Sequence, residues 1–449
     1  MQLLSFETPA IAHYAYLISD GIDAALIDPR RDIEEYLQAA RELGVRIRYI
    51  IETHRQEDFV MGSAYLAEQT GAKIVNGTHD LFGHGHLRLS DGEHICLGSL
   101  RIRALHTPGH TPESMCYAIF DSDDDKPAWG IFTGDTLFFG TTGRTDLTDR
   151  SKSVENAALL YQSIHTQLAD LGDTAFIFPA HGPGSVCGSG MAERPSSTLG
   201  VEKIDNEVFT LSQDDFAEKK GSEQLSRPPF FRHMEEVNLK GGIAPVNKMG
   251  SVNLLEVDAM LEQSNHALFY DTREPEAYAG GHVENSYSIW LGGLPVFGGW
   301  VGDENDDIYL LTDRESDIDV AINHLARIGI DNVKGALAGG FGTWRKSGAP
   351  ISSSGTLTAQ AIKDDPQSFQ ILDVRELDEY EQGHIPGAQH IFVGKLEDKL
   401  GELDFQKSRP VIVVCSVGHR AGLGVSILRR GGYEDVRNLL GGMSAWNQH

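Results

Sequence analysis

Four side chains that can bind a metal ion occur one after another, each just behind a short apolar run. They are His54, His110, Asp135 and His181. The preceding runs have the length and composition of β-strands, at 49–51, 102–105, 129–132 and 176–178. Loops that follow strands carry much of the chemistry of α/β folds. Imidazole and carboxylate groups in this repeated position therefore predict a metal site assembled from several loops.

A cysteine near the end of the chain indicates a second kind of chemistry. The apolar run at 411–414 predicts a strand, and a helix is expected from about Ala421. The loop between them contains Cys415, Ser416, Val417, Gly418, His419 and Arg420. Backbone N–H groups at a helix N-terminus favour negative charge, so a thiolate at Cys415 should be stabilised and nucleophilic. The same donors would hold the terminal sulfur of a persulfide; the alternative is a buried structural cysteine.

The elements that position the metal-capable residues alternate between strands and helices. Strands are expected at 13–18, 24–28, 73–76 and 95–97. An amphipathic helix at 32–43 ends at Gly44, a typical C-terminal cap residue, and a second helix spans 154–171. This interleaving is typical of a layered α/β sandwich.

The bulk properties set limits on the class of protein. A chain of 449 residues should form about two to four domains. The formal net charge of −27 argues against a nucleic-acid surface and against binding to an anionic membrane. Four widely separated cysteines predict no disulfide framework. No secretory signal or run long enough to span a membrane is visible, so we expect a cytoplasmic protein.

The C-terminal part of the chain contains an internal repeat. Asp-Thr-Arg at 271–273 and Gly-His-Val at 281–283 recur as Asp-Val-Arg at 373–375 and Gly-His-Ile at 383–385. Each copy ends in a Gly-Gly pair followed by a tryptophan, at 339–344 and 441–446. Such self-similarity predicts two copies of one small α/β domain. Pro228, Pro229 and the Gly241-Gly242 pair suit a junction before them, which we place near Lys240.

The order of the metal-capable residues resembles the metallo-β-lactamase fold over about residues 1–240. That family's motif is His-x-His-x-Asp-His, followed by a His, an Asp and a His from later loops. His54 and Asp58 match the motif here, but Gln56 and Phe59 stand where it has two further histidines. The resemblance implies an αββα sandwich. Because neither glutamine nor phenylalanine is a good metal ligand, the set for a pair of metals is incomplete.

Within this superfamily, the remaining set resembles the persulfide dioxygenases. His54, His110 and Asp135 match the two-histidine, one-carboxylate triad of non-haem Fe(II) oxygenases, which leaves open positions for O2 and substrate. The resemblance implies one Fe(II) per chain, with Gln56, Asp58 and His181 around it orienting water or a ligand. It also makes Arg144 a candidate contact for the carboxylate of the thiol substrate. A surface ion pair is the alternative for Arg144.

Both repeat copies resemble rhodanese (sulfurtransferase) domains. In the second copy the spacing Cys-x-x-Gly-x-Arg matches the rhodanese active loop, which implies Cys415 as sulfur carrier and Arg420 as anion clamp. Ser416, Val417, Gly418 and His419 would line that loop. In the first copy Asp313 is expected where the cysteine should stand, so we predict a catalytically silent domain. The predicted domains are 1–240, 248–350 and 355–449, an α/β architecture of a metallo-β-lactamase sandwich followed by two rhodanese-like domains.

These resemblances imply a persulfide dioxygenase, which oxidises a thiol persulfide to sulfite, joined to a sulfurtransferase. The expected small molecules are a thiol persulfide or thiosulfate, and O2; the identity of the thiol stays open, as does association into a homo-oligomer. Two alternatives remain. One is a thioester hydrolase of the glyoxalase II type, which uses a metal-bound hydroxide. The other is a sulfurtransferase attached to a metal-free binding module.

Overall fold

The computed structural model describes residues 1–121, 127–244, 252–264 and 266–448. These residues form two compact units, one of residues 1–227 with 231–244 and the other of residues 228–230 with 252–448. No described helix is both long enough and apolar enough to cross a lipid bilayer. All four cysteines are free thiols.

The first unit is a sandwich of two six-stranded sheets. The first sheet contains, in spatial order, β1 (Gln2–Thr8), β2 (His13–Ser19), β3 (Asp23–Ile27), β4 (Arg46–Ile51), β5 (Lys73–Gly77) and β6 (Leu87–Leu89). The second contains, in spatial order, β12 (Ser197–Thr198), β11 (Phe176–Pro179), β10 (Gly130–Gly134), β9 (Met115–Phe120), β8 (Leu100–His106) and β7 (His94–Leu97). Buried residues of both sheets, among them Ile18, Ile102 and Phe132, form one core between them.

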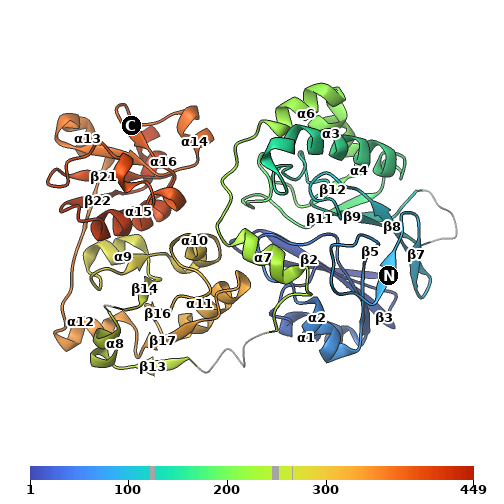
Figure 1. The fold of residues 1–449 in the computed structure, drawn as a ribbon, viewed down its shortest axis with the longest axis horizontal. Helices are drawn as coiled ribbons and strands as arrows, with labels where there is room; N and C mark the ends of the chain where they lie inside the picture. Colours follow the sequence, from blue (N-terminus) through green and yellow to red (C-terminus); the bar gives the residue numbers. More distant parts are fainter. Residues whose placement is uncertain (122–126, 245–251, 265, 449) are drawn as a thin grey trace. The chain divides into compact units, whose positions relative to one another are not determined.

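Helices cover the outer face of each sheet (Figure 1). Helices α1 (Glu34–Leu43) and α2 (Ser63–Thr70) pack on the first sheet. The second sheet is covered by α3 (Ser153–Ser163), a π-helical turn (Ile164–Leu168), α4 (Leu199–Asp205), α5 (Glu207–Thr210) and α6 (Gln213–Gly221). A 3-10 turn (Arg150–Lys152) precedes α3, and α7 (Phe231–Asn238) closes the unit. This helix–sheet–sheet–helix order is the predicted αββα sandwich.

The sandwich brings the metal-capable loops to one place because of how its strands run. Strands β3, β4 and β5 are parallel, and so are β10 and β11, so their carboxyl ends meet at one edge of each sheet. His54 follows β4, Asp135 follows β10 and His181 follows β11. Gly44 caps α1 as expected, with a left-handed φ of 68° and its N–H donating to the carbonyls of Ala40 and Arg41.

The second unit contains the two repeat copies, and both have a five-stranded parallel sheet with the same strand order. The first sheet contains, in spatial order, β13 (Asn253–Leu255), β17 (Val333–Leu337), β16 (Ile308–Leu311), β14 (Leu268–Asp271) and β15 (Tyr287–Ser288). The second contains β18 (Gly355–Leu357), β22 (Val436–Leu439), β21 (Val411–Val414), β19 (Gln370–Asp373) and β20 (Gln389–His390). The repeat read from the sequence is therefore also a repeat of topology.

Helices flank both of these sheets (Figure 1). In the first copy they are α8 (Val257–Gln263), α9 (Pro275–Gly280), a 3-10 turn (Leu291–Gly293), α10 (Leu294–Val301), α11 (Ser316–Arg327) and α12 (Phe341–Ser347). In the second they are α13 (Ala359–Asp364), α14 (Leu377–Gln382), α15 (His419–Arg430), α16 (Gly442–Asn447) and 3-10 turns at Pro366–Ser368, Val393–Lys395 and Leu400–Glu402.

The strand registers correct one sequence-based assignment. Asp271 pairs with Leu311 in the first copy as Asp373 pairs with Val414 in the second. The next residue along is Thr312 in the first copy and Cys415 in the second. Their carbonyls accept equivalent hydrogen bonds, from the N–H groups of Phe341 and Met443. Thr312, and not Asp313, therefore occupies the cysteine position, and a threonine hydroxyl carries no sulfane sulfur either.

Candidate functional site

The predicted triad residues converge in the first unit. The Nε2 atoms of His54 and His110 lie 3.8 and 3.4 Å from Oδ2 of Asp135. The three side chains come from the loops after β4, β8 and β10, and each residue is at most 2% exposed. Two imidazoles and a carboxylate thus face one another in a buried cluster, as a metal site requires.

Hydrogen bonds fix which nitrogen of each histidine faces this cluster. The Thr53 hydroxyl donates to Asp28 at 2.7 Å, so its oxygen accepts the Nδ1 proton of His54 at 2.9 Å. Nδ1 of His110 donates to the carbonyl of Arg144 at 2.8 Å. Both Nε2 atoms therefore keep their lone pairs for a metal. Burial lowers the pKa of His54 to about 4, which keeps this imidazole neutral.

The cluster lacks internal partners for its polar atoms. Nε2 of both histidines, Oδ2 of Asp135 and both carboxylate oxygens of Glu57 are buried without a hydrogen-bond partner. Leaving one such atom unsatisfied costs about 1–3 kcal/mol, so the four atoms near the histidine nitrogens, which exclude Oε1 of Glu57, need a common partner. A cation would supply it. His54, His110 and Asp135 would hold a first-row divalent ion, and this donor set fits iron.

Sequence reasoning missed Glu57. Its Oε2 lies 3.8 Å from Nε2 of His54 and 3.6 Å from Nε2 of His110. His54, Glu57 and His110 form a buried group whose ligand atoms all lie within 4.8 Å of one another. Glu57 matches no position of the family motif, and the signal that could have found it is its spacing of three residues from His54.

A second metal-capable group lies beside the first. It consists of Asp58, His181 and Cys187, all buried, with their ligand atoms within 4.8 Å of one another. Nε2 of His181 lies 3.0 Å from Asp58, and Nδ1 of His181 is bonded to Asp135 at 2.7 Å. Cys187 lies in a Gly/Ser-rich stretch of the sequence, and the fold brings its thiol into this group. Burial raises the pKa of that thiol well above its usual value.

The two departures from the family motif are both buried beside this site. The Gln56 amide has no hydrogen-bond partner among the described residues. Its backbone carbonyl accepts from Asn238 of α7 at 2.6 Å. The Phe59 ring packs against His13, with ring centroids 4.1 Å apart. Phe59 therefore places an apolar wall where the family has a ligand.

The predicted cysteine loop has the expected strand–loop–helix setting. Cys415 follows β21 and α15 begins at His419. Cys415 is 1% exposed, and its sulfur accepts a hydrogen bond from the N–H of Gly418 at 3.1 Å. Gly418 has a φ of 117°, a conformation that favours glycine, so this residue lets the loop close over the sulfur. We expected several backbone N–H groups to donate to this sulfur. Among the described residues, the structure shows this one bond.

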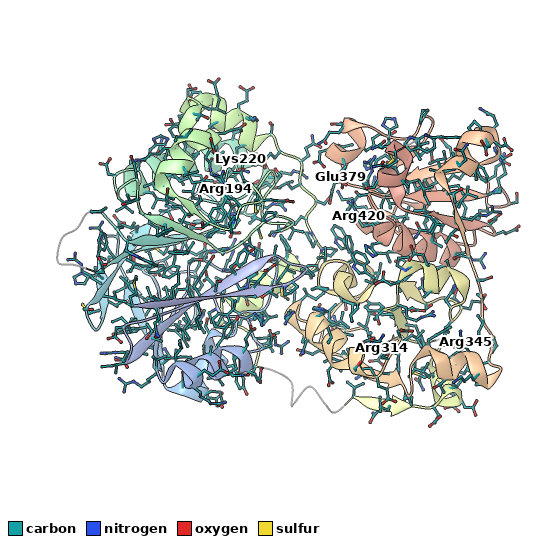
Figure 2. All side chains as sticks on the ribbon, turned by 180° about the vertical axis from the view of Figure 1, so that it is seen from behind. Arg194, Lys220, Arg314, Arg345, Glu379 and Arg420 are labelled. Carbon is teal, nitrogen blue, oxygen red and sulfur yellow. The ribbon has the colours of Figure 1, made fainter. Side chains whose placement is uncertain are left out.

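Arg420 is held by a carboxylate. Its guanidinium makes two bonds to Glu379, at 2.6 and 2.8 Å, and one to the Ser416 hydroxyl at 2.7 Å (Figure 2). Burial opposes charge on Glu379, but the hydrogen bond and charge of Arg420 lower its pKa to about 2. The arginine therefore belongs to a neutral pair that braces the loop, and it is less free to clamp an anion than the sequence suggested.

The first repeat copy contributes to the wall of this loop. The His419 ring stacks on Trp290 of the first copy, with centroids 4.8 Å apart and an interplanar angle of 17°. Nε2 of His419 lies 3.1 Å from Oε2 of Glu274, also in the first copy. Val417, at the tip of the loop, is 52% exposed. The loop that carries Cys415 is therefore in contact with residues of both copies.

Comparison with known proteins agrees with this architecture. The model of the metallo-β-lactamase superfamily matches residues 8–181, and that of the rhodanese-like domain matches residues 253–347 and 356–449. A crystal structure of a metallo-β-lactamase from Staphylococcus aureus is 30% identical, with a TM-score of 0.67, and the match covers 75% of this chain and 98% of that one. The chain belongs to the metallo-β-lactamase superfamily. Two rhodanese-like domains follow its metallo-β-lactamase domain.

Two curated relatives cover the metallo-β-lactamase domain. The mitochondrial persulfide dioxygenase ETHE1 of Homo sapiens is 27% identical over 243 residues, which are 52% of this chain and 86% of the relative. A probable metallo-hydrolase of Burkholderia pseudomallei is 28% identical over 298 residues, which are 57% of this chain and 98% of the relative. Both names are those of enzymes.

Arg144 of the metallo-β-lactamase domain is placed differently from our expectation. The residue is 1% exposed and forms a paired bond with Asp146. Its remaining N–H groups donate to the carbonyls of Val186, Leu225 and Ser226. Because a guanidinium has five N–H donors and all five are used, none is left for a substrate carboxylate. Arg144 instead holds its own loop in place, and the backbone carbonyl of Arg144 in that loop orients His110.

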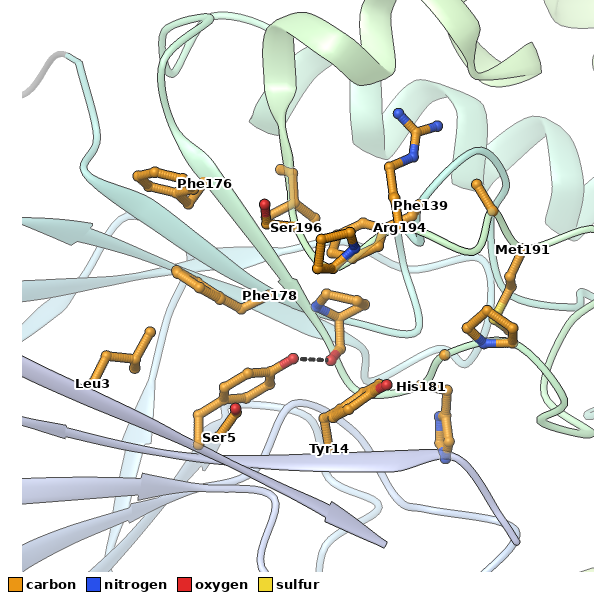
Figure 3. Close-up of a pocket in the computed structure, with 17 residues that line it drawn as sticks. Leu3, Ser5, Tyr14, Phe139, Phe176, Phe178, His181, Met191, Arg194 and Ser196 are labelled. Atoms are coloured by element: carbon orange, nitrogen blue, oxygen red, sulfur yellow. Dashed lines mark hydrogen bonds between the residues drawn. The ribbon is translucent and has the colours of Figure 1, made fainter. Parts of the chain in front are cut away.

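A cavity of about 210 Å³ lies beside the metal centre of the metallo-β-lactamase domain (Figure 3). Aromatic side chains line it, together with His181 and Arg194. The aromatic lining includes Tyr14, Tyr16, Phe139, Phe176 and Phe178. The Tyr16 hydroxyl donates to the carbonyl of Pro179 at 2.7 Å. His181 thus lines this cavity and also contacts the predicted metal triad, because its Nδ1 bonds Asp135.

Proposed function

We propose that the protein is an iron-dependent persulfide dioxygenase whose second rhodanese domain transfers sulfane sulfur. The persulfide dioxygenase relative and the rhodanese domains support a role in sulfur metabolism. The observation that carries the proposal is the convergence of His54, His110 and Asp135 with their metal-facing atoms unpaired. This donor set favours an oxygen-activating metal.

The oxidation balances as one persulfide, one O2 and one water giving one thiol and one sulfite with two protons. Ferrous iron, when bound, would supply the open positions and the electrons that activate O2. The chain's own residues hold that ion through His54, His110 and Asp135. Phe59 and His13 keep one side of the site dry, and the aromatic cavity takes the organic part of the thiol. Arg194, at the edge of that cavity, takes over the role that the sequence assigned to Arg144 (Figure 3).

The sulfur transfer takes place at Cys415. Its thiolate attacks the outer sulfur of a persulfide, the sulfur–sulfur bond breaks, and the thiol leaves with the electron pair. The Gly418 N–H supports the charge on the cysteine sulfur. Cys415 then passes this sulfur to a second acceptor. The first copy has Thr312 at this position and takes no part in the transfer.

Oxygen uptake by anaerobically purified protein tests the proposal. We expect uptake with glutathione persulfide in the iron-loaded wild type and in Cys415→Ser, and none in His110→Ala. Iron bound at about one ion per chain would agree with the triad. Uptake that survives in His110→Ala would overturn the proposed triad. A protein that binds no metal at all would also overturn the proposal and would leave a sulfurtransferase with a binding module.

One observation favours a second candidate, a metal-dependent thioester hydrolase. Asp58, His181 and Cys187 could hold another ion next to the first, and paired metals suit hydrolysis by a metal-bound hydroxide. Two zinc ions per chain and turnover of a glutathione thioester would support this reading. A cytoplasmic location and the absence of nucleic-acid and membrane partners stay predictions.

A further inference from the structure

We propose that Glu57 is a fourth protein ligand of the metal, so that two imidazoles and two carboxylates hold the ion. This inference rests on the metal centre of the proposed function but goes beyond its three-residue triad. It also concerns a residue that does not belong to the family motif. Three independent features of the site carry it: geometry, the absence of other partners, and charge.

The distances give Glu57 the same relation to the histidines that Asp135 has. Oε2 of Glu57 lies 3.8 and 3.6 Å from the Nε2 atoms of His54 and His110. Oδ2 of Asp135 lies 3.8 and 3.4 Å from the same atoms. Ligands with bonds of about 2.1 Å stand about 3.0 Å apart at right angles and about 3.4 Å apart at tetrahedral angles. Contraction of these distances by about 0.4–0.8 Å at right angles, or by at most about 0.4 Å at tetrahedral angles, would bring either oxygen onto an ion that both histidines bind.

No hydrogen bond among the described residues accounts for the carboxylate of Glu57. The residue is 0% exposed, and neither of its oxygens has a hydrogen-bond partner there. Its nearest arginine nitrogen is Nε of Arg55, 3.6 Å from Oε1, and the same nitrogen lies 3.8 Å from Glu113. Arg55 also lies 4.0 Å from Glu235, so it is shared among three carboxylates, and it faces the oxygen of Glu57 that points away from the histidines. Oε2 is left with the histidine nitrogens and the space between them.

The charge of the site also favours two carboxylates. A buried ion needs its charge balanced nearby, because burial of uncompensated charge costs several kcal/mol. Asp135 alone leaves a divalent ion with one positive charge, whereas Asp135 and Glu57 together neutralise it.

A fourth ligand changes what the metal can accept. An octahedral ion with three protein ligands has three open positions, and with Glu57 it has two. One position would take O2 and the other the terminal sulfur of the substrate. The site would then bind a persulfide through a single atom. A chelating substrate that needs two positions would compete with O2.

Cobalt(II) titration of the anaerobic, metal-depleted full-length protein tests this inference. Glu57→Gln keeps the size of the side chain but removes its charge, and Glu57→Asp keeps the charge but withdraws the oxygens by one methylene. We expect both variants to bind cobalt at least tenfold more weakly than wild type in competition with a chelator. We also expect the visible cobalt spectrum to change in band position and intensity, because the coordination number changes.

Glu113→Gln is the matched control, since Glu113 is a buried carboxylate that shares Arg55 with Glu57. It should retain both the cobalt affinity and the spectrum of wild type. If Glu57→Gln and Glu57→Asp, folded by circular dichroism, retain them as well, Glu57 serves only Arg55 and His110, and the inference fails. Weakened cobalt binding without oxygen uptake by iron-loaded wild type would instead leave Glu57 as a ligand and overturn the dioxygenase proposal.

Discussion

At the residue scale, the chemistry depends on how single side chains are oriented. Thr53 and the carbonyl of Arg144 direct the Nε2 atoms of the two histidines toward the metal. The sequence indicates His54, His110 and Asp135 because each follows a strand-like run. Glu57 and Cys187 could not be found in this way, since one lies off the motif and the other reaches the site only through the path of its loop.

Arg194 is the residue whose removal should affect substrate binding alone. Its contact with Asp205 is loose, at 3.6 Å, and its side chain is 22% exposed. Because a bond to a charged group contributes about 1.5–3 kcal/mol, we expect Arg194→Ala to raise KM for an anionic thiol persulfide by about tenfold with kcat unchanged. Steady-state oxygen uptake measures this. Arg232→Ala, at a side chain that is 85% exposed, removes the same charge elsewhere and should have no effect.

Glu379 gives the cysteine loop a dependence on pH. Its pKa is about 2 in the folded protein, against an ordinary value of 4.5. As the pH falls, the unfolded state therefore takes up this proton at a higher pH than the folded state does. The stabilisation by the Glu379–Arg420 pair is complete above about pH 4.5 and is lost as the pH falls toward 2. We expect Glu379→Gln to destabilise the loop at pH 6 and to differ less from wild type at pH 3. The denaturant midpoint at which Cys415 becomes open to exchange with an aromatic disulfide that reacts with thiols at acid pH, read by peptide mass, measures this; a difference that does not change with pH would contradict it.

At the element scale, loops are fixed by side chains that the sequence pattern does not reveal. The strands, the Gly44 cap and the repeat follow from apolar periodicity and turn residues, and the structure has them where they were expected. The role of Arg144 could not be predicted, because its partners lie at 146, 186, 225 and 226. The shift from Asp313 to Thr312 likewise needed strand register.

Removal of the Arg144 side chain should therefore affect metal binding and stability more than KM. Arg144→Ala leaves the buried carboxylate of Asp146 without its partner, and breaking such a pair costs about 3–5 kcal/mol. We expect a lower melting temperature and weaker cobalt binding, because the carbonyl that orients His110 is no longer held. A variant with normal stability and normal metal affinity but a raised KM would restore Arg144 as a substrate contact.

The junction of the two rhodanese copies makes a further prediction at this scale. A Cβ at Gly422 of α15 would stand 2.9 Å from Cβ of Pro275, so the helix behind Cys415 lies directly on the first copy. Trp290→Ala removes the stacking on His419, and aromatic pairs contribute about 0.5–1.5 kcal/mol. We expect a fall of about two- to tenfold in kcat/KM for sulfur transfer and a changed NMR titration of His419. Trp300→Ala, which removes a tryptophan packed on Phe392 instead, should leave that titration unchanged.

At the scale of the whole molecule, the two proposed sulfur chemistries belong to separate units. The metal-capable residues lie in the metallo-β-lactamase domain, and Cys415 lies in the second unit with its loop completed by Trp290 and Glu274. The contacts described above for the Cys415 loop, from Glu379, Trp290 and Glu274, all come from the two rhodanese copies. Loss of the metal should therefore leave this loop intact.

Metal depletion checks this independence. After treatment with an iron chelator under anaerobic conditions, we expect oxygen uptake to stop while Cys415 still gains one sulfur atom from glutathione persulfide, seen as a mass increase on its peptide. Cys415→Ser should show the reverse, with uptake retained and no sulfur gained at that peptide. If depletion also prevented loading of Cys415 from the same persulfide, the cysteine loop would depend on the occupied metal site. The two units would then not be independent, because metal bound in the first unit would control a loop of the second.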